Sequence, residues 1–325
     1  MIYKKKNDNV FDCDWIGYLH AAKISSTDKG TPLGKVISVF DYTLNIKTNC
    51  DELLVVSMSK VRSPINMNIL SVPDGDDSAA KGFKGIVEYG SEIKKENDNE
   101  IVVGGQISLQ LTKSRVFKNH LRRKRPSLAC LIRFENVSNK ILDTLMKQSK
   151  RGCLLNPDIT TRGVLYKFLR EIEKYRKIQQ DEKKFAKLIV SSLLQLCGRG
   201  PGFTPSGDDF ISGYCVLFNY LSQSLGFTKL NPSDKGIVHL TSWISFMLMR
   251  YYERCIVDEQ IQTMINSLAD GNFENYVSSL VQISYRGHTS GIDIATGMTA
   301  ALYTIIDCTT GTDLLKELLA ISPRL

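Results

Sequence analysis

The chain has 325 residues, and its 42 lysines and arginines against 34 aspartates and glutamates give it a formal charge of +8. A hydrophobic content of 42% and a charged content of 23% are those of a globular protein and exclude wholesale disorder or a fibrous architecture. No stretch approaches the roughly 18 apolar residues of a membrane span, and no apolar segment follows the basic N-terminus. We therefore expect a cytoplasmic protein of about two domains that has no membrane partner.

Apolar and polar residues alternate with the period of a strand through the first third of the chain. The predicted strands are rich in Val, Ile, Thr and Tyr and cover residues 36–48, 52–59, 85–92, 100–111 and 128–134. The strands follow one another without helices long enough for crossovers, which favours a mainly antiparallel sheet.

The apolar period changes to that of helices at about residue 137. Apolar residues share one helix face in several segments, such as Ile141, Leu142 and Leu145, or Leu165, Phe168 and Leu169. At least four more helical segments follow residue 205. The sequence thus predicts an α+β chain, with a mainly β domain at residues 1–135 and an all-α domain at residues 136–325.

Neither the cysteines nor the basic residues indicate a particular function. The eight cysteines form no CxxC pair, and no histidine stands at zinc spacing, so we expect reduced thiols, several of them in the core. The basic run at residues 122–125 lacks interleaved aromatics, and we interpret it as a solvated linker or edge strand. We expect no nucleic-acid partner.

An internal duplication marks the helical domain. Residues 191–200 (SSLLQLCGRG) and 278–287 (SSLVQISYRG) are identical at six of ten positions. After a loop that is three residues shorter in the second copy, Ser206, Gly207, Asp209 and Gly213 match Ser290, Gly291, Asp293 and Gly297. Each copy therefore predicts a helix, a glycine-rich loop and a second helix.

The start of each second helix has the composition of an anion site. Ser206 with Asp209, and Ser290 with Asp293, have the spacing of capping boxes. The first turn of a helix presents free N–H groups and the positive end of the helix dipole, and an arginine stands just upstream in each copy, at Arg199 and Arg286. A capping box also stabilises a helix that binds nothing, so a purely structural role stays open.

Four glycines lie inside these predicted helices, where each costs about 1 kcal/mol relative to alanine. Such a cost is tolerated where a backbone approaches closely, so Gly207, Gly213, Gly291 and Gly297 indicate that the two helix starts pack together. We therefore expect a pseudo-twofold arrangement that brings both anion sites into one cleft.

The two loops contain further candidate residues. The first, GRGPGFTPSGDD, is more constrained than a cap requires and resembles an anion-cradling nest through Gly200, Gly202 and Thr204. His288 in the second loop is a candidate acid or base, or a residue of local hydrogen bonding only. Asp208 is a candidate for a substrate amide or for Mg²⁺, but no further carboxylates for Mg²⁺ can be placed, and we expect no cofactor.

GRGPGFTPSGDDFISG and GHTSGID, with TSWISFMLMRY between them, resemble the AllH-like family over roughly residues 185 to 300. The family is linked to the oxamate carbamoyltransferase of anaerobic allantoin degradation. The resemblance implies one subunit of a transferase that works beside an FdrA-like subunit and a third partner. The positions that match the family's two loops are Gly198, Gly200, Pro201, Gly202, Thr204, Pro205, Ser206, Asp208, Asp209, Gly287, His288, Thr289, Ser290, Gly291 and Asp293.

By this resemblance the reaction interconverts oxalurate plus phosphate with oxamate plus carbamoyl phosphate, so the substrates are small anions. We expect Arg199 and Arg286 to clamp the anions, His288 to carry the proton, and Asp208 with Asp293 to orient the nucleophile. The alternative is a module that binds a small anion without catalysis and regulates or scaffolds a catalytic partner, since the sequence offers no obvious activated nucleophile.

Overall fold

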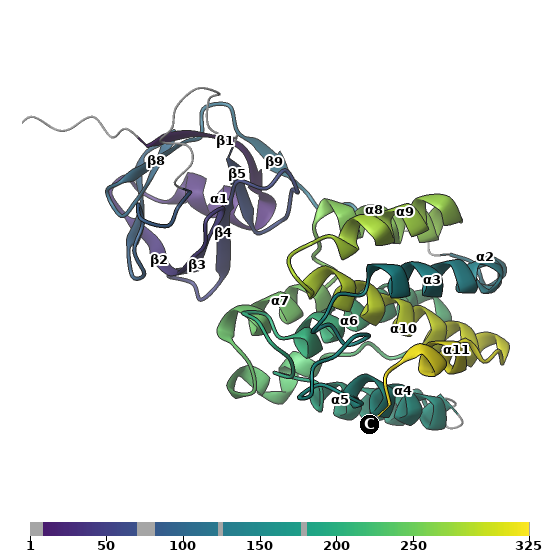
Figure 1. Ribbon diagram of the computed structural model, residues 1–325. Coiled ribbons are helices and arrows are strands. Elements are labelled where there is room, and N and C mark those ends of the chain that lie inside the picture. Colours follow the sequence, from purple (N-terminus) through teal and green to yellow (C-terminus); the bar gives the residue numbers. More distant parts are fainter. Residues whose placement is uncertain (1–8, 70–81, 123–125, 177–180, 325) are drawn as a thin grey trace, which may run out of the picture. The chain divides into compact units, whose positions relative to one another are not determined.

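The computed structural model describes residues 9–69, 82–122, 126–176 and 181–324. Contacts within the chain divide it into two units, Met1–Asn119 and His120–Leu325. The described strands all lie in the first unit, and the second consists of helices and loops (Figure 1). The predicted α+β class is confirmed.

Of the basic run at residues 122–125, only Arg122 lies in the described part of the chain. Its side chain lies 3.4 Å from Asp270 in an exposed ion pair, and residues 123–125 lie outside the described part.

The first unit is a sheet that closes on itself. Its strands are β1 (Val10–Gly17), β2 (Pro32–Val39), β3 (Thr43–Thr48), β4 (Leu53–Ser57), β5 (Asn66–Ile69), β6 (Glu92–Asn97), β7 (Glu100–Val103), β8 (Ile107–Gln110) and β9 (Arg115–Phe117). They follow the order β5-β4-β3-β2-β6-β7-β8-β1-β9, and an additional β5–β1 pairing closes the ring.

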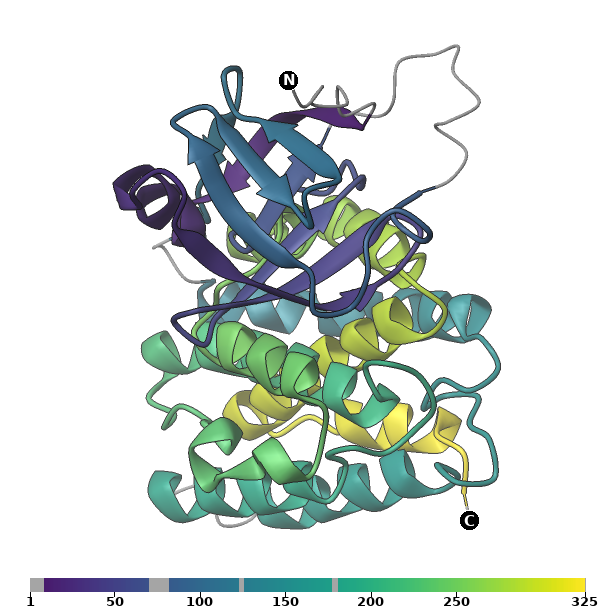
Figure 2. The same cartoon turned by 90° about the vertical axis from the view of Figure 1, so that its left-hand side faces the viewer.

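The pairing in this sheet is mainly antiparallel, as predicted, with parallel pairs only at β1–β8, β1–β9 and β4–β5 among the described strands. Inward side chains such as Val36, Leu44, Ile46 and Val56 are fully buried and form the core of the unit. The short helix α1 (Tyr18–Ser26), which contacts β1 and β9, lies beside the strands in Figure 2.

Three of the predicted strands differ from the structure. Residues 36–48 form the hairpin of β2 and β3, with its turn near Asp41, and residues 100–111 form the hairpin of β7 and β8 around Gly104 and Gly105. Residues 85–92 are mostly turns, since Gly85 and Gly90 adopt positive φ. Glycines in a left-handed conformation thus interrupt two of these three runs, whereas residues 36–48 turn without a glycine.

The prediction of a strand at 128–134 is wrong, because this segment forms the helix α2 (Leu128–Arg133). Ser127 caps that helix by accepting a hydrogen bond from the Cys130 N–H, and Leu131 and Phe134, three residues apart, are both fully buried. The helical unit therefore begins earlier along the chain than residue 136.

The other helices of the second unit are α3 (Ser138–Gln148), α4 (Val164–Tyr175), α5 (Glu182–Leu194), α6 (Ser206–Leu225), α7 (Trp243–Glu253), α8 (Glu259–Asp270), α9 (Phe273–Ser284), α10 (Ser290–Thr310) and α11 (Leu314–Ile321). Helices α6 and α10 are the two longest of the described helices, and their side chains are buried almost all round. A helix that is buried on every side forms the centre of a helical domain.

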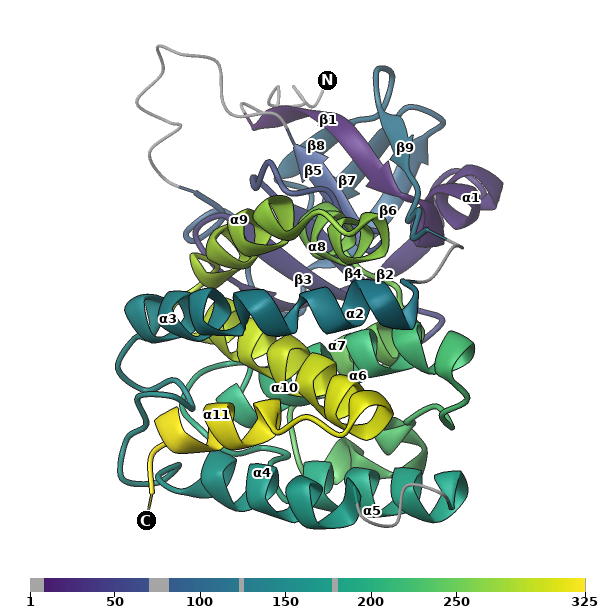
Figure 3. The same ribbon diagram turned by 90° about the vertical axis from the view of Figure 1, so that its right-hand side faces the viewer.

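The two central helices are covered by the rest of the unit. Figure 3 shows α10 crossing the unit between α3 on one side and α11 with α4 on the other, and α10 contacts each of them. Among the described helices, none is both long and apolar enough to cross a membrane.

Helices α6 and α10 pack most closely where two of the predicted glycines lie. A Cβ atom on Gly213 would stand 2.1 Å from the carbonyl oxygen of Ile294, and one on Gly297 would stand 2.1 Å from that of Phe210. The backbones thus touch where no side chain fits, and the predicted close packing is confirmed.

Candidate functional site

The duplication is a structural repeat with the same contacts in each copy. The Gly207 N–H donates to the Arg199 carbonyl at 2.8 Å, and the Gly291 N–H donates to the Arg286 carbonyl at 3.2 Å. A Cβ on either glycine would stand 1.9 Å from a carbonyl oxygen at the end of the preceding helix. Glycine is therefore required in both copies so that the second helix can start against the end of the first.

The predicted capping boxes are wrong. Pro205 and Thr289 occupy the N-cap positions of α6 and α10, and neither helix has a side-chain cap. The Ser206 hydroxyl donates instead to the Gly152 carbonyl at 3.3 Å. Within the described part of the chain, the backbone N–H groups of Ser206 and Ser290 have no acceptor. Both helices therefore begin with an N–H group that lacks an acceptor, but Ser206 is fully buried, whereas Ser290 is half-buried.

The two glycine-rich loops meet, as the duplication predicted. The Thr204 and Ser290 hydroxyl oxygens lie 3.0 Å apart and share a hydrogen bond between the first loop and the start of α10. The Thr204 hydroxyl also lies 3.2 Å from Oδ2 of Asp209, to which it donates. Thr204 and Ser290 are half-buried, whereas Asp209 beneath them is only 6% exposed. Residues from both copies thus form one polar cluster.

Two aspartates of the duplication lie at the centre of this cluster. Burial raises the pKa of Asp209 well above its usual range and the Asp293 carboxylate raises it further, against the hydrogen bonds of Ser290 and Thr204. Burial raises the pKa of Asp293 to about 7, although the Leu154 N–H donates to its Oδ1 at 2.8 Å. A buried pair of carboxyl groups retains a proton near neutral pH, because two adjacent charges cannot both be solvated.

One oxygen of Asp293 stands out. Its Oδ2 atom is buried and has no hydrogen-bond partner among the described residues. The side chains of Ser206 and Thr289 lie beside Asp293 and lower its pKa, but the Ser206 hydroxyl directs its proton to the Gly152 carbonyl. A buried polar atom without a partner is uncommon in a folded protein, so this oxygen indicates a candidate functional position.

A segment that sequence reasoning missed covers the same cluster. Residues 150–156 connect α3 to the turns before α4 and pass over the helix starts, where Gly152 accepts from Ser206 and Leu154 donates to Asp293. A Cβ on Gly152 would stand 3.6 Å from Pro201 of the first loop and 3.9 Å from Thr289 of the second. Its sequence, KRGCLLN, belongs to neither copy of the duplication, so self-similarity did not indicate it.

Asp208 has different hydrogen-bond partners from the two central aspartates, Asp209 and Asp293. Its Oδ1 accepts from the Gly198 N–H at 2.7 Å, and its Oδ2 accepts from the Thr241 hydroxyl. Burial raises its pKa. The duplication places Ile292 at the equivalent position, which is consistent with a carboxylate used to tie the first loop to the chain before α7.

The structure does not bring the two arginine side chains together. Arg286 forms a bidentate ion pair with Asp258, in which its Nη1 lies 2.6 Å from Oδ2 and its Nη2 contacts Oδ1. Its Nε donates to Oε1 of Gln260 at 2.6 Å. Arg199 is exposed and lines a pocket of about 310 Å³ with Lys167 and Glu171 of α4. The equivalent backbones are alike, but the guanidinium groups serve different neighbours.

The remaining candidates form the outer part of the loops. Gly200 and Gly202 have φ values of +105° and +103°, and a Cβ on Gly200 would stand 2.9 Å from that of Ser206. Gly287 and His288 are exposed, and no acceptor is found within the described ranges for the N–H groups of these four residues. Successive free N–H groups next to left-handed glycines form an anion-binding concavity.

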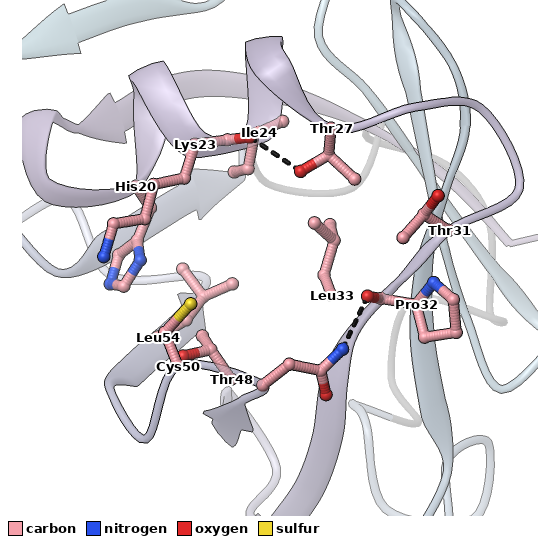
Figure 4. Close-up of a pocket in the computed structure, with 11 residues that line it drawn as sticks. His20, Lys23, Ile24, Thr27, Thr31, Pro32, Leu33, Thr48, Cys50 and Leu54 are labelled. Carbon is pink, nitrogen blue, oxygen red and sulfur yellow. Dashed lines mark hydrogen bonds between the residues drawn. The ribbon is translucent and has the colours of Figure 1, made fainter.

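A separate small pocket lies in the first unit (Figure 4). It measures about 120 Å³, and its walls are largely apolar, with Ile24, Leu33 and Leu54 among the lining residues. His20 shares a 2.9 Å hydrogen bond with the Leu53 carbonyl, and burial lowers its pKa, so it lines the pocket as a neutral ring. The pocket includes none of the residues of the duplication.

Comparison with protein families finds a match to the family described as oxamate carbamoyltransferase subunit AllH over residues 196–302. The matched segment is about a third of the chain and contains both loops, the helices α6 to α9 and the part of α10 up to residue 302. The resemblance of the helical unit to the AllH-like family is thereby confirmed. Searches of curated proteins and of solved structures found no significant match. Within the described ranges, no group of three or more His, Cys, Asp or Glu side chains is placed to hold a metal ion.

Proposed function

We propose that this AllH-like chain is the subunit of a multi-subunit carbamoyltransferase that holds small anionic substrates where its two glycine-rich loops meet. The observation that carries the proposal is the hydrogen bond between Thr204 and Ser290, since it joins the two copies of the duplication in one cluster. The family match over the same segment supports the reaction class. As the resemblance implies, an FdrA-like subunit and a third subunit would complete the enzyme.

The substrates of the proposed reaction are oxalurate with phosphate, or oxamate with carbamoyl phosphate. Each carries a carboxylate or a phosphate, and free N–H groups at a helix start bind such groups without a further cation. The N–H groups of Gly200, Gly202 and Ser290 are candidates for this task, whereas Ser206 is fully buried. Fixed donors of this kind also stabilise the negative charge that develops when a carbamoyl group is attacked.

The other predicted site residues divide into two groups. Arg286 and Asp208 act by holding the two loops in place, because their charged atoms already have partners. The Arg286 guanidinium binds Asp258, and the Asp208 carboxyl group accepts from the Gly198 N–H and the Thr241 hydroxyl. Gly207, Gly287, Thr289 and Gly291 shape the backbone around the substrates. His288 is exposed on the second loop and is the proposed proton carrier for the phosphate group. Arg199 stays a candidate for the rim of the site.

The proposal is tested on the chain purified with its partner subunits. The wild-type assembly should form carbamoyl phosphate from oxalurate and phosphate, and His288→Ala should lower kcat by about 10²- to 10⁴-fold. Lys187→Ala, on the exposed face of α5, is the control and should retain full activity. Full transfer by the His288→Ala assembly would refute the role of His288 but not the proposed reaction.

The non-catalytic module predicts a different result. Calorimetry would then show phosphate binding by the chain, and the assembly with its partners would show no turnover of any of the four substrates. This outcome would replace the proposed transferase subunit with a regulatory or scaffolding subunit.

A further inference from the structure

The duplication produces two pairs of serine and aspartate, and each pair crosses between the copies. Ser206 of the first copy lies beside Asp293 of the second, and Ser290 of the second lies beside Asp209 of the first. The two pairs are related by the repeat, but they differ in access. Ser206 and Asp293 are fully buried, and residues 150–156 cover them.

The other pair reaches the surface of the unit. Ser290 is half-buried and shares its hydrogen bond with Thr204, which is half-buried as well. The Thr204 hydroxyl donates to Asp209, and the Ser290 hydroxyl lies close enough to lower the pKa of Asp209, which is almost completely buried behind them. The two hydroxyl groups are thus more exposed than the carboxyl group of Asp209.

We propose that Ser290 and Asp209 form the proton path of the site, in which Asp209 is the acid and the Ser290 hydroxyl passes its proton to the substrate. The inference rests on the proposed function and assigns its acid–base step. Under it Asp209, rather than Asp208 or Asp293, supplies the proton, and Thr204 fixes the direction of the Ser290 hydroxyl.

The step balances in the direction of carbamoyl phosphate formation. A phosphate oxygen forms a bond to the carbamoyl carbon of oxalurate, and the bond from that carbon to the amide nitrogen breaks, with its electron pair going to nitrogen. The Ser290 hydroxyl gives its proton to this nitrogen and receives the proton of Asp209. Oxamate and carbamoyl phosphate result, and the proton that the attacking hydrogen phosphate loses returns to the Asp209 carboxylate through the Ser290 hydroxyl, which restores the acid for the next turnover.

Asp293 makes Asp209 suitable for this task. Its carboxylate lies close enough to raise the pKa of Asp209, and its Oδ2 has no hydrogen-bond partner within the described residues, so its negative charge is poorly compensated. Asp208 and the Tyr252 side chain are the other titratable groups that interact with Asp209. An acid that holds its proton near neutral pH is the kind that general acid catalysis requires.

The test is the pH dependence of carbamoyl phosphate formation by the complete assembly. Ser290→Ala and Asp209→Asn should each lower kcat by about 10²- to 10⁴-fold with little change in the KM for phosphate. In the wild type kcat should fall as pH rises through the pKa of the acid, and this fall should vanish in Asp209→Asn. Asp293→Asn should move the fall to lower pH, because it removes the neighbouring charge.

Ser222→Ala, a buried serine near the far end of α6, is the matched control and should retain the wild-type rate and profile. If the wild type forms carbamoyl phosphate and Ser290→Ala or Asp209→Asn retains its rate and profile, the proton path is refuted and the proposed function stands. A carbamoyl ester on Ser290 found by mass spectrometry would also refute it, because Ser290 would then be a nucleophile. A wild-type assembly without any transfer would refute both.

Discussion

Gly213 and Gly297 occupy equivalent places on opposite sides of the crossing of α6 and α10. Each faces the backbone of the other helix at a residue related by the same repeat, Ile294 for Gly213 and Phe210 for Gly297. The crossing is therefore a pseudo-twofold contact between the two copies. It places both helix starts at the same end of the central pair, where the loops meet.

This contact predicts that Gly213→Ala and Gly297→Ala are strongly destabilising. A methyl group at either position would stand 2.1 Å from a carbonyl oxygen, so the two helices would have to separate. We expect a loss of about 3 kcal/mol or more in the free energy of unfolding, the upper end of the range for overpacked positions. Urea unfolding followed by circular dichroism measures this loss. Lys187→Ala on α5 should change it by less than about 0.5 kcal/mol.

The central carboxyl pair predicts that stability falls as pH rises. Folding raises the pKa of Asp293 from 3.8 to about 7, so the folded chain holds this proton more tightly than the unfolded chain. The stabilisation is complete below pH 4 and is lost as pH rises to about 7, on the order of 4 kcal/mol for this group alone. Asp209 acts in the same direction.

Asp293→Asn should accordingly be more stable than the wild type at pH 8 and show a weaker dependence on pH. Thermal unfolding between pH 5 and 8 measures the difference. Asp143→Asn, on the exposed side of α3, should keep the wild-type dependence. An Asp293→Asn curve parallel to that of the wild type would mean that Asp293 is ionised throughout this range.

The ion pair of Arg286 and Asp258 predicts that removing one partner greatly lowers the stability of the folded chain. Arg286→Ala would leave the Asp258 carboxylate, which also caps α8, only 9% exposed and without its counter-ion. We expect a loss of about 3 kcal/mol in the free energy of unfolding. The double variant Arg286→Ala with Asp258→Asn should lose less than the sum of the single variants, since no isolated charge remains. Additive losses would show that the pair contributes little.

The segment over the helix starts predicts an effect on activity as well as on stability. Gly152 has a φ of +93°, so Gly152→Ala should cost about 1–2 kcal/mol. Gly236→Ala, at a φ of +68° with open space around it, should cost a similar amount. Only Gly152→Ala should weaken phosphate binding in calorimetry, because its methyl group would lie against Pro201 of the first loop and Thr289 of the second. Equal binding by both variants would show that this segment is not part of the site.

Much of the fold follows from local patterns in the sequence. The change from alternating to helical periodicity placed the two kinds of structure correctly, and the faces that include Leu145, Leu169 and Ile189 are fully buried. The prediction failed at residues 128–134, where a short apolar run has no period of its own. Ser127 decides the outcome there, because its hydroxyl accepts the hydrogen bond that starts a helix.

The candidate site could be predicted in outline. Self-similarity at a constant offset is visible without a structure, and it led to the convergence of the loops that Thr204 and Ser290 confirm. The hydrogen bonds within the site could not be predicted, since the spacing of Ser206 and Asp209 is that of a cap within one copy. In the structure, each serine lies beside the aspartate of the other copy.

The sequence by itself determined that a helical unit is built on a repeat and that glycines at four positions allow its helices to approach. Each copy and its glycines can be recognised from composition and spacing within one segment, and the repeat follows from comparing two such segments. Only the tertiary structure decided that Arg286 binds Asp258, that Asp209 and Asp293 lie together, and that residues 150–156 cover one serine and leave the other accessible. Such pairings join residues far apart in the chain, and packing rather than periodicity selects them.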